Sequence, residues 1–437
     1  MLDSKALTKV QSVILIVIVV AAATVGVFGY VLLGSQNQSS ETVKIGVFAD
    51  LDAEGGSSIW KGIVLAAEQL NAEGGMLGKQ VEVIGEDNDV ESGENAERMN
   101  LALTRLLSLH EVNFIIGIAG SEGFMIQDMI AQHERIFFEI GANQDAYTQR
   151  VLDDYDRYKY YFRLMPNTTS IFQGIPESLA DLREQTGFNR VGYIGEESVW
   201  KGVMEGLDYV LPEVYGFDLV YKGALPLGTV DFTSYFAVAE AAGVEIMLPL
   251  FTFEEATAFV KEYYERQSPM VVYGGALGVV GGLEGWEITE GKCEYASCAG
   301  LFPMISGYPL TNKTFPAREA YITRWDEIPG GNGVFAYDIL RYILPDAVER
   351  ADALEVDAVI EALEKTSVET TSARNLVFTS SHDVMMGENL SNPAADYYLV
   401  IIYQWQDAKQ VPVYPKKIME EAGATYIFPD WPGPWNK

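Results

Sequence analysis

The sequence predicts an α/β protein built from two lobes, each a doubly wound parallel sheet covered by helices. Short, continuously apolar runs that suit buried parallel strands alternate with amphipathic helical stretches. This alternation breaks near residues 161–167 and then begins again, which indicates a second lobe. The chain has 437 residues, of which 48% are hydrophobic and 12% aromatic, so it can build two sizeable cores and is not a disordered protein.

The first βαβ unit spans residues 43–89. Residues 43–48 and 81–84 read as buried strands, and apolar residues between them recur at helical spacing. Ser57 or Ser58 is placed to cap that helix, so its exposed N–H groups would face the carboxyl edge of the sheet. Doubly wound sheets bind ligands at this edge.

The remaining elements of the first series follow the same rule. We expect a helix over 94–109, a strand over 113–118, a helix ending at His133 and a strand over 136–139. The connecting loops, 119–123 and 140–143, both contain glycine. Because they follow parallel strands, they should gather at one sheet edge.

A second series begins at residue 190. Its expected strands are residues 190–194, 219–224, 244–250 and 270–273, with helices between them. Later, residues 337–350 and 356–365 have helical periodicity, and 396–405 predicts a last strand. The predicted hinge strands are 162–167, 273–278 and 375–379. Residues 43–163 plus 279–374 would then form lobe one, and 164–278 plus 375–437 lobe two.

The N-terminal 42 residues are expected to be a membrane anchor and a polar tether. No charged side chain occurs from Val10 to Ser40, and Ser12 to Leu33 is almost wholly apolar, which is long enough to cross a bilayer as a helix. Lys5 and Lys9 precede this run, so the bulk of the chain should lie on the extracellular side of the cell membrane. The alternative is a cleaved signal peptide, but no clean cleavage site follows closely.

Charge and chemistry exclude several classes of function. With 30 basic and 62 acidic residues, the formal charge of −32 disfavours nucleic-acid binding. There is no P-loop and no Gly-x-Ser-x-Gly elbow, and the three histidines are scattered. We therefore expect no enzyme activity, no cofactor and no metal. The only two cysteines, Cys293 and Cys298, are expected to form a small-loop disulfide outside the cytosol.

The spacing of residues in the opening unit is more specific than its periodicity. Gly62, Leu65, Ala66, Glu68, Asn71, Gly74-Gly75, Gly78 and Val81-Glu82 lead to Asp87-Asn88-Asp89. This string resembles the first unit of type I periplasmic binding proteins, in particular the branched-chain amino-acid (Leu/Ile/Val) receptors of ABC importers. The resemblance extends over about residues 43–405 and implies the type I periplasmic binding protein fold.

The resemblance also implies a ligand site. Ser121 resembles the family serine that holds the ligand carboxylate, and Ile140-Gly141-Ala142-Asn143 resembles a Gly-Ala-Thr loop whose alanine N–H and hydroxyl share it. Asn143 replaces that hydroxyl and can still donate a hydrogen bond. The remaining predicted ligand-binding residues are the aromatic walls Trp200 and Phe251, together with Trp60, Glu122 and Ala276. Ser121 and Asn143 could alternatively be helix caps, and Trp200 a core residue.

Ala276 departs from the family pattern. Amino-acid-binding members carry an acidic residue at this place, which pairs with the ligand ammonium, and an unpaired ammonium in a cleft is costly. Either Glu122, Glu196 or Glu197 substitutes, or the ligand has no ammonium and is an amide, keto acid or aromatic acid.

Taken together, these features predict an extracytoplasmic substrate-binding protein of an ABC importer. It would close its two lobes on a small polar-headed solute, an amino acid, amide or carboxylic acid, and deliver it to permease subunits. The alternative is a sensory receptor domain that signals to a membrane partner.

Overall fold

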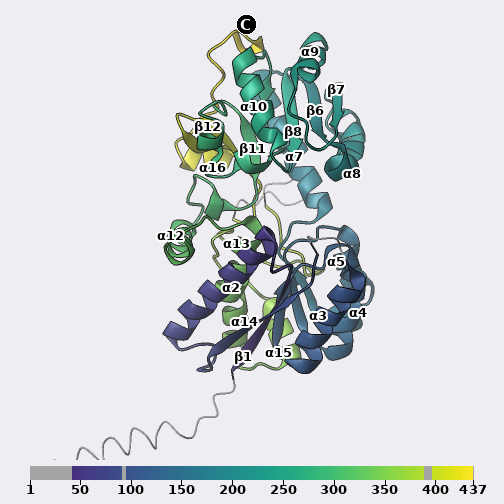
Figure 1. The fold of residues 1–437 in the computed structure, drawn as a ribbon, viewed down its shortest axis with the longest axis vertical. Helices are drawn as coiled ribbons and strands as arrows, with labels where there is room; N and C mark the ends of the chain where they lie inside the picture. The colour runs from purple at the N-terminus through teal and green to yellow at the C-terminus, as the bar shows by residue number, and fades with distance from the viewer. Residues whose placement is uncertain (1–41, 91–94, 388–395, 437) are drawn as a thin grey trace, which may run out of the picture.

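The computed structural model describes residues 42–90, 95–387 and 396–436, and it has two α/β lobes (Figure 1). Each lobe contains its own parallel sheet, as the sequence predicts. The N-terminal anchor predicted over 1–42 lies almost wholly outside the described residues. Within the described ranges, no helix combines the length and the apolar character needed to cross a bilayer.

The sheet of the first lobe has five parallel strands in the order β2-β1-β3-β4-β5. They are β1 (Val43–Ala49), β2 (Val81–Asp87), β3 (Phe114–Gly117), β4 (Ile136–Glu139) and β5 (Tyr161–Arg163). The chain leaves β1 toward β2 on one side and returns on the other side of β1 to form β3. This reversal of strand order opens a crevice at the carboxyl ends of β1 and β3.

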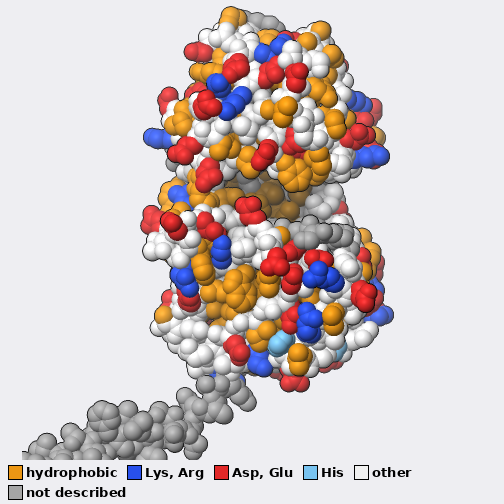
Figure 2. Space-filling model, in the orientation of Figure 1, with side chains coloured by type: hydrophobic (Ala, Val, Ile, Leu, Met, Phe, Trp, Pro, Cys, Tyr) orange, Lys and Arg blue, Asp and Glu red, His pale blue; other side chains and the backbone are white. Residues whose placement is uncertain are grey.

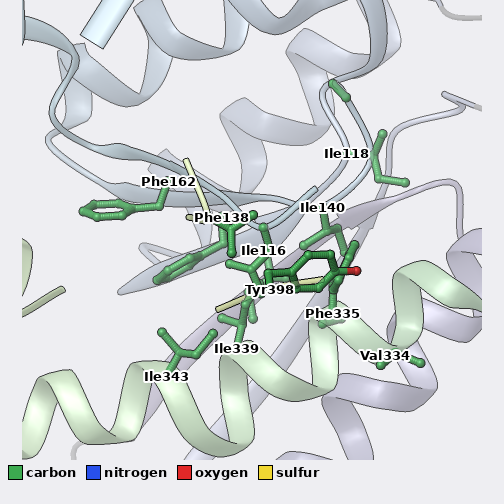
Figure 3. Close-up of a cluster of buried hydrophobic side chains, with 14 of the residues drawn as sticks. Ile116, Ile118, Phe138, Ile140, Phe162, Val334, Phe335, Ile339, Ile343 and Tyr398 are labelled. Atoms are coloured by element: carbon green, nitrogen blue, oxygen red, sulfur yellow. The ribbon is translucent and has the colours of Figure 1, made fainter. Parts of the chain in front are cut away.

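Helices cover both faces of this sheet. One face carries α2 (Glu54–Glu73), α13 (Gly331–Asp338), η6 (Ile339–Ile343) and α14 (Leu344–Ala351), and the other α3 (Ala96–Thr104), η1 (Arg105–Leu109) and α4 (Gly123–His133). The remaining helices of this lobe are α5 (Asp145–Asp153), α6 (Tyr155–Tyr158) and α15 (Val356–Leu363). In Figure 3, Phe335 and Ile339 of the α13–η6 segment project toward Ile116 and Phe138 of the sheet. All four are almost fully buried, so this packing excludes water from the core of the lobe.

The start of α2 differs from the prediction. The helix begins at Glu54 with Ala53 at its N-cap, one turn before the serines expected to cap it. Glycine makes this possible, because a Cβ at Gly56 would lie 1.8 Å from the carbonyl oxygen of Asp50. Ser58 lies inside the helix, where its hydroxyl oxygen accepts a hydrogen bond of 2.7 Å from the N–H of Gly330.

The second lobe repeats the parallel arrangement, with the strand order β10-β8-β6-β7 and β9 beside β8. Its elements are α7 (Thr168–Thr186), β6 (Arg190–Glu196), α8 (Glu197–Tyr209), η3 (Val210–Val214), β7 (Asp218–Leu225), α9 (Thr233–Ala241), β8 (Ile246–Phe251), α10 (Glu255–Arg266), β9 (Val271–Val272), β10 (Ala276–Leu277), η4 (Gly278–Gly281) and α11 (Gly285–Ile288).

A three-stranded antiparallel sheet completes the second lobe. It consists of β11 (Ser297–Gly300), β12 (Ile401–Gln406) and β13 (Lys409–Tyr414), followed by α16 (Lys416–Glu421) and η7 (Pro434–Asn436). The indole N–H of Trp405 donates to the carbonyl of Val280, which ties this sheet to η4. Between β11 and α13 lie η5 (Pro303–Ile305) and α12 (Thr314–Trp325).

The lobe boundaries differ from those predicted. Residues 279–300 lie in lobe two rather than lobe one, because β11 pairs with β12 and the N–H of Ala299 donates to Gly275. Residues 375–384 lie in lobe one rather than lobe two, because the N–H of Val384 donates to Arg163 of β5. Both assignments depend on pairing between segments far apart in the chain, which local patterns do not encode.

Three segments connect the lobes. The first follows β5 and leads into α7 at Thr168. The second and third lie near Leu301 and Tyr398, and the Tyr398 hydroxyl donates to the Leu301 carbonyl. The last two crossings therefore lie side by side, away from the predicted hinge strands 273–278 and 375–379.

The predicted disulfide is also wrong. Cys293 and Cys298 are free thiols, both buried in the core of the second lobe. Cys298, in β11, pairs through its backbone with Tyr403 of β12, while the Cys293 thiol donates toward the carbonyl of Gly285 at 3.6 Å. Burial raises the pKa of each thiol to about 12, so both stay neutral and act as small apolar core residues.

Candidate functional site

The space between the lobes is the candidate site. Figure 2 shows a hollow there, with hydrophobic side chains inside it. Two cavities lie in this region, one of about 380 Å³ and one of about 180 Å³. Asn143 lines both, so the two cavities adjoin each other at this residue, and a small molecule could contact both.

The larger cavity is polar and lies at the crevice of the first sheet. The segments that follow β3 and β4 form most of its wall, as the strand order requires. Its lining residues are Gly55, Val90, Ile118, Gly120, Ser121, Gly141, Ala142, Asn143, Gln144 and Asn332. The predicted residues Ser121, Ala142 and Asn143 are therefore brought together.

A buried carboxylate holds the loops of this cavity. Glu139, the last residue of β4, is fully buried and accepts hydrogen bonds from the N–H groups of Ala119, Gly141 and Ala142 at 2.9, 2.7 and 2.7 Å. Burial raises the pKa of the Glu139 carboxyl, while the three N–H donors oppose that rise by stabilising its charge. Glu139 thereby fixes the loops after β3 and β4 relative to each other.

Arg163 holds the same loop from the other side. Its guanidinium is fully buried and donates to the carbonyl of Gln144 at 2.7 Å and to that of Ala142 at 3.3 Å. It also pairs with Asp383 at 2.6 Å. The guanidinium of Arg163 is therefore paired with Asp383 and with the loop carbonyls, and Arg163 does not line the polar cavity.

The smaller cavity is apolar and lies where α7, α8 and the crossing segments meet. Its lining residues are Asn143, Met165, Thr168, Ile171, Ile175, Trp200, Val203, Gly275, Ala276, Ala299, Leu301 and Val400. Trp200 is held in place because its indole N–H donates to the hydroxyl of Thr252 at 2.9 Å. The predicted residues Trp200 and Ala276 thus both line this cavity, as an apolar wall contributed by the second lobe.

Three predicted residues lie elsewhere. Phe251 is fully buried in the core of lobe two, where its ring packs against Phe232 and Phe259. Trp60 covers β2, so that a Cβ at Gly85 would lie 2.9 Å from its ring. Glu122 ends the short helix η2 (Gly120–Glu122) and lines neither cavity.

Sequence reasoning missed the contribution of α13 and of the crossing segments. Asn332 reaches the polar cavity from the first turn of α13, almost 190 residues after Asn143. Met165, Leu301 and Val400 each come from a different crossing. The Gly-Gly-Asn-Gly sequence at 330–333 was the one available signal, since glycines allow close approach to α2.

The charge of the site is unusual for one that would hold an ionic ligand. No Lys, Arg, His, Asp or Glu is among the described residues that line the two cavities. In the ranges that the structure describes, no group of three or more His, Cys, Asp or Glu residues is arranged to hold a metal ion. The polar side chains among these lining residues are amides and hydroxyls.

The sequence of this chain is similar to those of known binding proteins. Residues 42–398 match the model of a family described as periplasmic binding protein. A Leu/Ile/Val-binding protein homolog from Brucella melitensis is 23% identical over 371 residues, which cover 82% of this chain and 85% of the relative.

Two solved structures illustrate the similarity of fold. An ABC transporter substrate-binding protein from Sphaerobacter thermophilus has a TM-score of 0.68 and 20% identity, covering 86% of this chain and 97% of that one. The branched-chain amino-acid transporter substrate-binding protein LivJ from Streptococcus pneumoniae, in complex with isoleucine, has a TM-score of 0.64 and 18% identity, covering 86% and 100%.

Proposed function

The chain belongs to the periplasmic binding protein family, and from this premise we propose that it is the substrate-binding component of an ABC importer. It would capture one small solute between its two lobes, outside the cytoplasm, and deliver the closed form to permease subunits in the membrane. Members of this family bind rather than transform their ligands, so no catalytic step is part of the proposal.

The observation that carries this proposal is the pair of cavities that share Asn143. A polar cavity belongs to the strand ends of lobe one, and an apolar cavity is walled by Trp200 and Ala276 of lobe two. A solute with a polar head and an apolar body would contact both lobes at once. Its binding would therefore favour the closed arrangement, since only that arrangement satisfies both contacts.

The connections between the lobes support such a movement. Each crossing is a short segment rather than a helix, and short segments at element ends are where hinge motion is usually absorbed. The residues that border the cleft from the crossings are Met165, Leu301 and Val400. Closure would therefore reshape the apolar cavity directly.

Attachment to the membrane is part of the same proposal. The uncharged, almost wholly apolar run from Ser12 to Leu33 supports an N-terminal anchor, with the lobes on the extracellular side. A tethered receptor would stay close to its permease, which raises the effective concentration of one for the other.

Native mass spectrometry of the full chain, purified in detergent without denaturation, tests the proposal. We expect a co-purified small molecule that is released on unfolding. Small-angle scattering of the stripped protein should then show a decrease in radius of gyration when this molecule is added back. A protein that carries no small molecule, and whose scattering no candidate solute changes, would contradict a solute-capturing function.

A further inference from the structure

Glu139 occupies the backbone donors that a ligand carboxylate would need. The N–H groups of Gly141 and Ala142 both donate to one carboxylate oxygen of Glu139 at 2.7 Å, and the N–H of Ala119 donates to the other at 2.9 Å. A backbone N–H makes one strong hydrogen bond, so these three donors are already used. The loops around the polar cavity therefore offer a ligand anion fewer N–H groups than their positions suggest.

No positive side chain compensates for this. The described residues that line the polar cavity are all uncharged, and Arg163 is committed to Asp383 and to two carbonyl groups below the loop. A ligand carboxylate at Ala142 would lie beside Glu139 without a counter-ion. Two carboxylates that share a site repel each other, and one of them must take up a proton or be excluded.

The groups that do face the cavity suit an uncharged head. Asn143, Gln144 and Asn332 line the polar cavity, and their side chains are amides, each with both donors and acceptors. A carboxamide head also carries an N–H donor and a carbonyl acceptor in one plane, so it can pair with such side-chain amides. The adjoining apolar cavity, with Met165 and Trp200 among its walls, suits an aliphatic or aromatic body.

We propose that this site selects an uncharged, carboxamide-headed solute with an apolar body and discriminates against the matching carboxylate, because Glu139 fills the carboxylate cradle from within the protein. This inference deepens the proposed function and rests on it. It also removes the difficulty at Ala276, since a ligand without charge needs no acidic partner.

The test compares two ligands that differ only in their heads, 4-methylpentanamide and 4-methylpentanoate, by calorimetry on the full chain. The wild-type protein should bind the amide at least about tenfold more tightly. In Glu139→Ala the N–H groups of Gly141 and Ala142, both of which line the polar cavity, become available, so the affinity for the carboxylate should rise by about tenfold or more and largely remove the preference for the amide.

Two further variants separate this effect from a loss of fold. Glu139→Gln keeps the side-chain volume and a carbonyl acceptor but removes the charge, so it should gain part of the carboxylate affinity. Asp338→Ala removes another fully buried carboxyl, which accepts the N–H of Thr371 and lines neither cavity. It should lose a similar amount of stability without any change of ligand preference.

Two outcomes would overturn the inference. One is a wild-type protein that binds the carboxylate as tightly as the amide. The other is a folded Glu139→Ala or Glu139→Gln variant whose carboxylate affinity does not exceed that of the wild type. Closure of the wild-type lobes on a carboxylate that binds as tightly as its amide would contradict this selectivity while supporting solute capture, so the two proposals fail separately.

Discussion

Arg163 and Asp383, 220 residues apart, form a buried ion pair with 2.6 Å between Nε and Oδ1. Asp383 also accepts hydrogen bonds from Thr148 at 2.8 Å and from Asn167 at 3.0 Å. Asn167 is the N-cap of α7, so this one carboxylate joins the end of β5 to the first helix of lobe two. Since Arg163 also holds the carbonyls of Ala142 and Gln144, the pair links the binding loop to a crossing between the lobes.

Removing Asp383 should therefore be costly. In Asp383→Ala the guanidinium of Arg163 stays buried without a counter-ion, and we expect the free energy of unfolding to fall by about 3–5 kcal/mol. Urea denaturation measures this loss. As a control, Asp357→Ala removes the exposed partner of Lys159 (2.5 Å), and should cost at most about 1 kcal/mol. Equal losses in the two variants would mean that Arg163 finds another partner.

Trp200 should matter for affinity and Trp60 only for stability. Trp200→Ala removes a wall of the apolar cavity, so the affinity for the native solute should fall by about ten- to a hundredfold, as expected for about 1.5–3 kcal/mol of lost apolar contact. Trp60→Ala exposes Gly85 on β2, away from both cavities. Titration of each stripped variant with the co-purified molecule measures the two affinities. A comparable loss of affinity in Trp60→Ala would mean that Trp60 also contributes to the binding site.

Ser121 stays a predicted ligand residue. Ser121 lines the polar cavity, and Ser121→Ala should weaken binding of the native solute by about tenfold if one ligand hydrogen bond is lost. Calorimetry on Ser121→Ala beside wild type measures this. Unchanged affinity would assign Ser121 to the support of its own loop.

The two thiols should be inert in the folded protein. The pKa of each is raised to about 12 by burial, so at pH 8 neither forms the reactive thiolate. Because the folded pKa exceeds the ordinary value of about 9, the contribution of each thiol to stability is present below about pH 9 and decreases as the pH rises toward 12. Iodoacetamide at pH 8 without reductant should label neither cysteine natively and both in denaturant, as intact mass would show. If neither cysteine is labelled in denaturant, the two cysteines form a disulfide and the prediction of free thiols is wrong.

The lobes should fold without the N-terminal segment. Val43 is fully buried in β1, and the described core begins with it. A truncated chain that begins at Ser40 should therefore be soluble and monomeric, with the same urea midpoint as the full chain in detergent. Aggregation of the truncated chain, while the full chain stays dispersed, would place residues before Ser40 within the fold.

Much of the architecture follows from the sequence because it depends on local periodicity. Most strands of the two parallel sheets, and the loops that carry Ser121 and Asn143, lie where apolar runs and glycines predict them, whereas β5 and β10 fall in segments predicted as hinge strands. In a doubly wound sheet, the connectivity alone brings such loops to one edge. The family string between Gly62 and Asp89 adds a relationship that periodicity cannot supply.

Only the tertiary structure decided which lobe owns residues 279–300 and 375–384, because long-range pairing with β12 and β5 sets both. It also decided that Glu139 turns inward onto the N–H groups of Gly141 and Ala142. A glutamate at the end of a strand can face solvent, a ligand or its own loop with the same sequence pattern. The choice depends on which donors surround it once the sheet has formed, and a linear sequence does not specify that.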